Sequence, residues 1–109
     1  MLVEKRNEVT IFTPGQRVDA NNSADIEKTI FENVGNGGGK VIIDLSQVDY
    51  MSSAGLRVLL VTAKHMTQGG GRLGLCHLNA HVKEIIEVTG FVGIIQCYDS
   101  VDQCLASFQ

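Results

Sequence analysis

A chain of 109 residues is long enough for one hydrophobic core, and we expect a single domain over residues 1–109. The formal net charge of −3 argues against the concentrated basic surface that nucleic-acid binding requires. No apolar run approaches the roughly 18 residues that cross a bilayer, and the first residues lack the order of a signal peptide. We therefore expect a cytoplasmic protein with neither a membrane nor a nucleic acid as its partner.

Hydrophobic periodicity predicts strands that alternate with helices after an initial hairpin, whose two strands cover residues 2–6 and 9–12. The apolar run at residues 40–45 is typical of a strand that is covered on both faces. The other expected elements are helices over 23–34, 54–68, 80–89 and 101–108 and strands over 72–78 and 91–98. The order ββαβαβαβα predicts an α/β fold: a mixed, mainly parallel sheet with an N-terminal antiparallel hairpin and flanking helices.

The cysteines form an odd set without a C-x-x-C pair, so we expect reduced, buried thiols and neither a disulfide framework nor a zinc ribbon. They are Cys76, Cys97 and Cys104. His77 and His81 lie near Cys76 in the sequence, but Asn79 indicates that a strand ends there. We interpret these histidines as surface or strand-edge residues and expect no metal site and no cofactor.

A glycine-rich segment, GNGGGKV at residues 35–41, is similar to a phosphate-binding loop but lacks its requirements. Val34 stands where the first glycine of that loop belongs, and no Ser or Thr follows Lys40. The segment also joins a helix to a strand, the reverse of the phosphate-loop order. We interpret it as a turn, and QGGGRL at residues 68–73 likewise.

Ser53 lies between an expected strand and an expected helix, where a hydrolase would carry its nucleophile. Met51 replaces the first glycine of the G-x-S-x-G motif, and little chain remains for an acid and a histidine on loops. We therefore expect no catalytic residue and no enzyme activity. Ser53 is instead predicted to be the N-cap of a helix that begins at Ala54, with its oxygen accepting a hydrogen bond from Gly55 or Leu56.

A helix N-terminus also stabilises an anion, so a phosphate on Ser53 would be tolerated there. Projection of the helix at 100° per residue places a row of side chains outward, with a second set beside it. The row is Arg57, Val61, Lys64 and Gln68, and beside it lie Ala54, Val58 and His65. We expect Val58 and Val61 to face water. An apolar strip with basic neighbours predicts a surface that binds a protein partner.

The segment VIIDLSQVDYMSSAGLRVLL at residues 41–60 resembles the signature of STAS domains, and a free-standing chain of this length is similar to the anti-sigma factor antagonists. The matching positions are Asp44-Leu45, Tyr50, Ser53, Gly55 and Leu56. In addition, Val18-Asp19-Ala20 is similar to the Leu-Asp-Ala turn that precedes the first helix of the family. The resemblance extends over essentially the whole chain.

This resemblance implies a phosphorylation switch. The unmodified antagonist would bind an anti-sigma factor that is also a serine kinase, and the kinase would transfer phosphate from ATP to Ser53 and so release the complex. A metal-dependent serine phosphatase would restore the hydroxyl group. The chain would be a substrate and would need no cofactor of its own.

Two positions depart from the family pattern. Ser52 stands where the best-known antagonists often have Asp, which makes Ser52 the second candidate for phosphorylation. One additional residue separates Gly15 from Asp19, and we expect this loop, with Asp19, to form part of the same docking face.

Two other functions stay open on the sequence. One is a STAS regulatory subunit of a larger assembly, such as a lipid-transport complex, in which Ser53 caps a helix and is never phosphorylated. The other is a module that binds a nucleotide or another small ligand at the same helix N-terminus.

Overall fold

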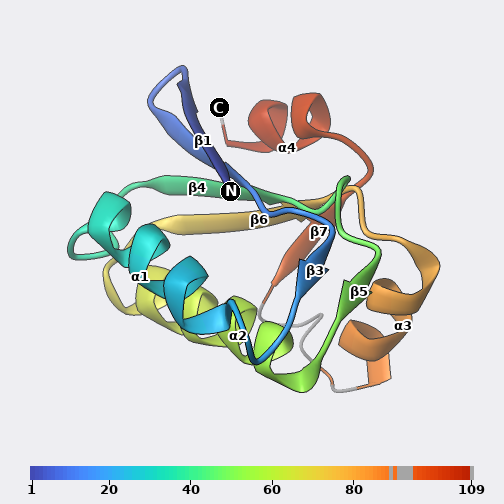
Figure 1. Cartoon of the computed structure of the whole chain (residues 1–109). Helices are drawn as coiled ribbons and strands as arrows, with labels where there is room; N and C mark the ends of the chain where they lie inside the picture. The colour runs from blue at the N-terminus through green and yellow to red at the C-terminus, as the bar shows by residue number, and fades with distance from the viewer. Residues whose placement is uncertain (89, 91–94, 109) are drawn as a thin grey trace.

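A five-stranded sheet forms the centre of the computed structural model, which describes residues 1–88, 90 and 95–108 (Figure 1). The strands lie in the order β1-β2-β4-β6-β7. Their bounds are β1 Leu2–Arg6, β2 Val9–Thr13, β4 Lys40–Asp44, β6 Arg72–Cys76 and β7 Gln96–Tyr98. Strands β1 and β2 pair antiparallel, and all other neighbours pair parallel. The predicted mixed, mainly parallel sheet with an N-terminal hairpin is therefore confirmed.

Helices cover both faces of this sheet (Figure 1). They are α1 Ser23–Val34, α2 Ser53–Gln68, α3 Ala80–Val88 and α4 Val101–Ser107. The buried residues of α1, α2 and α3 share one hydrophobic core with one side of the sheet, and those of α4 share a second core with the other side. The result is a three-layer α/β arrangement in which α4 alone, among the described helices, packs on its face.

The central strand β4 shows why its sequence is continuously apolar. Val41 and Ile43 belong to the core beneath α1 and α2, whereas Ile42 belongs to the core beneath α4. Because successive side chains of a strand point to opposite faces, a strand covered on both sides needs apolar residues at every position. All three side chains are buried, as the composition of this segment predicts.

Most element bounds agree with the sequence analysis, and the differences lie at element ends. The strand expected over residues 72–78 ends at Cys76, because His77 adopts a left-handed backbone conformation with φ of 57°. Of the strand expected over 91–98, residues 96–98 form β7, and residues 91–94 lie outside the described residues. Residue 89, the expected end of the third helix, also lies outside them.

Two strands were not expected: β3 (Arg17–Val18) and β5 (Tyr50–Met51), which pair parallel in a separate two-stranded sheet. Each contributes only two residues, too few to produce a hydrophobic alternation that a sequence could show. This small sheet lies beside the N-terminus of α2, and it positions the candidate site described below (Figure 1).

The cysteines are free, but they do not share one environment. Cys76 and Cys104 are buried as expected, whereas Cys97 is exposed on β7, the edge strand, so the prediction of a buried thiol is wrong there. Burial and then the neighbouring Asp44 carboxylate raise the pKa of Cys76 to about 12, and burial raises the pKa of Cys104 to about 11. Both buried thiols are therefore protonated at neutral pH.

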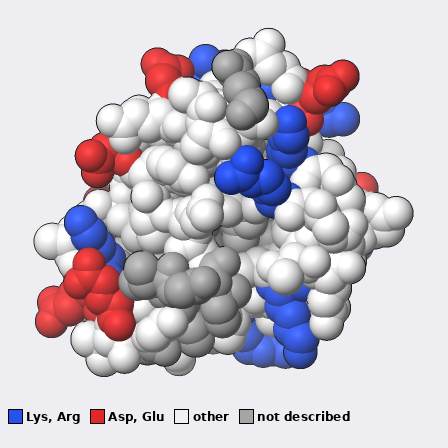
Figure 2. Space-filling view, turned by 180° about the vertical axis from the view of Figure 1, so that it is seen from behind, with Lys and Arg blue, Asp and Glu red and all other residues white. Residues whose placement is uncertain are grey.

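Two properties of the structure concern nucleic acids and membranes, the two kinds of partner that the sequence argues against. On the face shown in Figure 2, Lys and Arg form small groups separated by uncharged surface, so the described part of this face carries no continuous basic stripe. In the described part of the chain, no helix combines the length and the hydropathy of a bilayer span.

Gly74 in β6 determines how closely α4 approaches the sheet. A Cβ atom at this position would collide with the Sγ atom of Cys104. Gly74→Ala should therefore lower the free energy of unfolding by about 1–3 kcal/mol, measured by urea denaturation, because α4 must move or Cys104 must change rotamer.

A matched control is Gly39→Ala, since a Cβ atom there would meet no atom of the described residues within 4 Å beyond its two chain neighbours. This control should leave the free energy of unfolding nearly unchanged. In a Cys104→Ala background the cost of Gly74→Ala should fall, because the colliding sulfur is gone. Equal costs in the two backgrounds would show that the Cys104 contact does not control the packing of α4.

Candidate phosphorylation and docking site

The two-stranded sheet holds the segment before α2 in place. Val18 pairs with Met51 in the parallel register, and the backbone N–H of Ser52 donates to the Val18 carbonyl oxygen at 2.9 Å. The backbone N–H groups of Asp49 and Tyr50 both donate to the carbonyl oxygen of Gln16, at 2.8 and 3.2 Å. These bonds fix the backbone that leads directly to the two adjacent serines.

Ser52, and not Ser53, is the N-cap of α2. Ser52 has an extended backbone, its Oγ atom accepts a hydrogen bond from the Gly55 N–H at 3.4 Å, and its carbonyl oxygen accepts one from the Leu56 N–H at 3.0 Å. The prediction that Ser53 caps the helix is wrong by one residue. Both serines can cap a helix, and pairing with β3 extends the chain through Ser52 and lets the helix begin at Ser53.

Ser53 is the first residue of α2, and its side chain is exposed. Its hydroxyl group makes no hydrogen bond with the described part of the chain, because the capping role belongs to Ser52. The two neighbouring hydroxyl groups therefore differ: Ser52 is half-buried and stabilises the helix, while Ser53 faces solvent at its positive end.

Gly55 lets the helix begin against the small sheet. A Cβ atom at this buried position would lie 2.7 Å from both the Cγ1 and the carbonyl oxygen of Val18, and 2.9 Å from the Cγ atom of Met51. No larger residue fits unless the helix withdraws from β3 and β5. The Ser-Ala-Gly sequence thus combines an exposed hydroxyl with the close packing that fixes its position.

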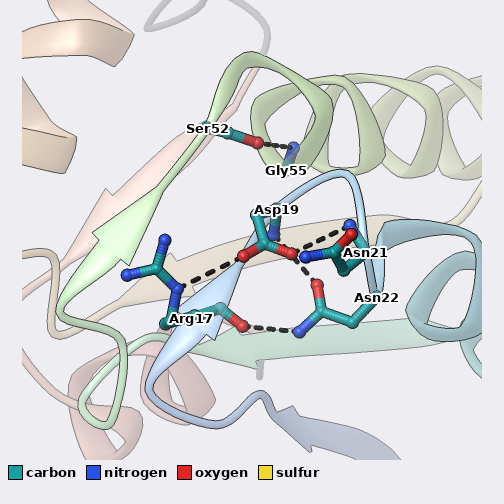
Figure 3. Close-up of polar contacts among 6 residues, drawn as sticks. All are labelled: Arg17, Asp19, Asn21, Asn22, Ser52 and Gly55. Atoms are coloured by element: carbon teal, nitrogen blue, oxygen red, sulfur yellow. Dashed lines mark hydrogen bonds and ion pairs between the residues drawn. The ribbon is translucent and has the colours of Figure 1, made fainter.

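The loop before α1 is held by hydrogen bonds centred on Asp19 (Figure 3). Its carboxylate accepts from Arg17 Nε at 3.3 Å and from the Asn21 N–H at 2.9 Å, and its own N–H donates to Asn22 Oδ1 at 2.9 Å. Asn22 Nδ2 in turn donates to the Arg17 carbonyl oxygen at 2.7 Å. Because β3 pairs with β5, this ordered loop lies next to the N-terminus of α2.

Arg17 and Tyr50 add an exposed contact that the sequence analysis missed. The guanidinium carbon of Arg17 lies 4.5 Å from the centroid of the Tyr50 ring, and 40% of Tyr50 is exposed. The two residues are register partners in the β3–β5 pair, which brings together positions 33 residues apart in the sequence. No sequence signal identifies such a contact when each strand has only two residues. The aromatic residue of the signature thus lies at the surface, two residues before Ser52.

The outward face of α2 agrees only in part with the sequence analysis. Arg57 and Lys64 are exposed and Val61 is half-buried, but Val58 is only 4% exposed and belongs to the main core, so the prediction that Val58 faces water is wrong. Val58 is buried because α2 approaches the small sheet closely at Gly55, which brings this part of the helix against Val18. The apolar component of the proposed strip is therefore reduced to Val61.

Two further residues expected beside the strip are not fully exposed. Ala54 is half-buried at the start of α2. His65 is also half-buried: its ring stacks on Phe31 with centroids 4.7 Å apart, and Nε2 lies 2.8 Å from the carbonyl oxygen of Gly35. His65 thus joins α2 to the end of α1 and is not free to contact a partner without losing these interactions.

The model of the STAS domain family matches residues 1–104, so this chain belongs to the STAS domain family. Over 92 residues the chain is 39% identical to BtrV of Bordetella bronchiseptica, a protein provisionally named an anti-sigma factor antagonist. This alignment covers 84% of the chain and 79% of BtrV. The names of such relatives describe regulatory proteins and not enzymes.

Solved structures share the same fold at low sequence identity. The crystal structure of a provisionally named anti-sigma factor antagonist from Thermotoga maritima has a TM-score of 0.90 and 23% identity, and the match covers 97% of this chain and 92% of that one. SpoIIAA in its unphosphorylated form has a TM-score of 0.81 and 14% identity, with 98% and 94% covered. The phosphorylated form of Bacillus SpoIIAA has a TM-score of 0.77 and 14% identity, with 99% and 98% covered.

The different environments of the two serines predict different effects on stability. Ser52→Ala should lower the free energy of unfolding by about 1 kcal/mol, because it removes the acceptor for the Gly55 N–H. Ser53→Ala should change it by less than about 0.5 kcal/mol, because the exposed hydroxyl has no hydrogen bond to lose among the described residues. Urea denaturation of the two variants measures both values, and the opposite ranking would contradict the assignment of Ser52 as the cap.

Proposed function

We propose that this chain is an anti-sigma factor antagonist that acts by partner switching, with Ser53 as the residue that is phosphorylated. The observation that supports this most directly is the exposed Ser53 hydroxyl at the first position of α2, beside a Ser52 hydroxyl that is used as the cap. The relatives named anti-sigma factor antagonists support the general function. The unphosphorylated form would bind an anti-sigma factor that is also a serine kinase.

The proposed modification needs no catalytic group from this chain. The Ser53 oxygen attacks the γ-phosphorus of ATP, the bond from that phosphorus to the bridging oxygen breaks, and ADP leaves. The hydroxyl proton passes to a base of the kinase, which also supplies Mg²⁺. A metal-dependent serine phosphatase reverses the change by hydrolysis, with inorganic phosphate as the second product.

The local structure can accept a phosphate at Ser53 without unfolding. The added charge of about −1.5 to −2 would lie at the positive end of a 16-residue helix. Arg57 is four residues further along α2, at the spacing that places two side chains on the same helix face. The hydrogen bond from Gly55 to Ser52 does not involve Ser53 and would persist.

The same charge would weaken a complex whose interface includes the start of α2. We place the docking face on Ser53, Ala54, Arg57, Val61 and Lys64, with the Asp19 loop beside it. Docking removes water from these residues, and burying a phosphate between Arg57 and a partner that supplies no further cation carries a large desolvation cost. Phosphorylation would thus act on binding and leave the fold in place.

Substitutions at Ser53 test the switch when their binding to the cognate anti-sigma factor kinase is compared with that of the wild type. Ser53→Asp should weaken binding at least tenfold, because it places a permanent charge at the interface. Ser53→Ala should bind as the unmodified protein does and should no longer be released by ATP. Binding is measured by titration calorimetry with and without ATP. Equal dissociation of both variants, with and without ATP, would contradict the switch.

The matched control is Ala106→Asp, which introduces the same charge on an exposed residue of α4, on the opposite face of the sheet from α2. It should leave binding unchanged. Intact-mass measurement after incubation with the kinase and ATP should show one added phosphate in Ser52→Ala and none in Ser53→Ala. The reverse result would assign the phosphate to Ser52, and no phosphate on the wild type would favour a regulatory subunit that is never modified.

Substitutions at the adjacent residues Arg57 and Val58 should distinguish an effect on partner binding from an effect on folding stability. Arg57→Ala should weaken partner binding with little change in the free energy of unfolding, because Arg57 is exposed. Val58→Ala should lower the free energy of unfolding by about 1–3 kcal/mol, because Val58 is in the core, while the folded variant should bind normally. Calorimetry and urea denaturation measure the two effects. A loss of binding in folded Val58→Ala alone would contradict the proposed docking face.

A further inference from the structure

Three side chains of metal-binding types meet at the carboxyl ends of β4 and β6. Asp44 is the last residue of β4, Cys76 is the last residue of β6, and His77 follows it. A carboxylate oxygen, the thiol sulfur and a ring nitrogen all lie within 4.8 Å of one another. The sequence places only Cys76 and His77 together, and parallel pairing of β4 and β6 adds Asp44 from 32 positions earlier.

The backbone holds these three positions firmly. Asp44 and Cys76 are register partners, so their side chains point to the same face of the sheet. The Leu45 N–H donates to the Cys76 carbonyl oxygen at 3.0 Å, which continues the hydrogen bonding between β4 and β6 beyond Asp44. His77 has φ of 57°, and its N–H donates to the Tyr98 carbonyl oxygen at 3.3 Å. Each candidate ligand thus extends from backbone that hydrogen bonds fix.

The surroundings leave donor atoms available to an ion. One oxygen of Asp44, Oδ1, accepts the Ser46 N–H at 3.0 Å, which orients the carboxylate. The carboxylate also accepts a hydrogen bond from the Cys76 thiol, and an ion would take the place of that proton between the two side chains. Cys76 is buried, and its Sγ atom has a weak contact with the Ile43 carbonyl oxygen at 4.0 Å. His77 is exposed, so the cluster is open to solvent on the side of the imidazole.

We propose that Asp44, Cys76 and His77 bind one divalent ion of the zinc type, with water as the fourth ligand. The mixture of oxygen, sulfur and nitrogen selects Zn²⁺ or Co²⁺ over Mg²⁺ and Ca²⁺, which prefer oxygen ligands throughout. Metal–ligand bonds of about 2.0–2.3 Å place neighbouring ligand atoms roughly 3–4 Å apart. His77 is exposed, so its imidazole can rotate to bring a ring nitrogen toward the other two ligand atoms.

Binding replaces a proton with a metal ion. The Cys76 S–H bond breaks, the proton passes to solvent, and the sulfur forms a bond to the ion as a thiolate. No oxidant or reductant takes part. Because residues 45–52 lead from Asp44 to the start of α2, the ion would tie β4 to β6 at the end of the sheet from which the serine-bearing segment departs. An ion that binds only the folded state raises the melting temperature.

The test is a Co²⁺ titration of the full chain, kept reduced with a phosphine. The expected result is one Co²⁺ per chain, with a thiolate-to-Co²⁺ charge-transfer absorption in the near ultraviolet that added Zn²⁺ abolishes. His77→Asn should weaken Co²⁺ binding at least tenfold, because it removes the imidazole and keeps a residue type that tolerates a left-handed backbone. Asp44→Asn and Cys76→Ser should do the same, and Cys76→Ser should also lose the charge-transfer band.

The matched controls are His81→Asn and Cys97→Ser, which remove the same residue types at exposed positions outside the cluster. Both should bind Co²⁺ as the wild type does. The absence of a charge-transfer band in the wild type would overturn the proposal, and so would a band that persists in Cys76→Ser or disappears in Cys97→Ser. Unchanged affinity in His77→Asn, an exposed substitution that should fold, would overturn it independently of any effect of Cys76→Ser on stability.

Discussion

The packing of Gly55 against Val18 is the contact on which the candidate site depends. A residue with a Cβ atom would overlap the Val18 backbone and side chain, so only glycine allows α2 to begin where it does. The position at which α2 begins determines that Ser52 has an extended backbone after β5 and that Ser53 is the first residue of the helix. It also brings the side of α2 that carries Val58 against the core, which is why Val58 is buried while Arg57 is not.

Adjacent serines have separate roles because of this geometry. The Ser52 hydroxyl accepts the Gly55 N–H and so satisfies one of the backbone donors that a helix start leaves unpaired. The Ser53 hydroxyl is then left to solvent. A chain with one serine would have to use the same oxygen for both roles, and modification of that oxygen would remove the cap. In this chain, stability and accessibility belong to two different side chains.

The longer elements could be predicted from the sequence because each carries several turns or alternations of hydrophobic pattern. The helix over residues 23–34 and the hairpin strand over 2–6 have the bounds that were expected. The strands β3 and β5 could not be predicted, because two residues each provide no period. Their absence from the sequence analysis explains two errors at the site: the cap was placed one residue late, and Val58 was assigned to the surface.

The family signature directs attention to residues 41–60, but the arrangement around this segment depends on tertiary contacts. Asp19 was expected near the site from a resemblance alone, and the β3–β5 pairing supplies the physical reason for its proximity. The contact between Arg17 and Tyr50 joins residues 33 positions apart, for which the chain offers no local signal. His65 was assigned from helical projection, which cannot show that Phe31 of a neighbouring helix covers its ring.

The cap at Ser52 has a consequence for the kinetics of the proposed switch. Since the hydrogen bond from Gly55 to Ser52 does not involve the Ser53 hydroxyl, no segment of the chain would have to refold when a phosphate is added to Ser53 or removed. The delay between signal and response would then be set by the two opposing enzymes and by complex dissociation. Repeated cycling would not expose the hydrophobic core to proteolysis or aggregation.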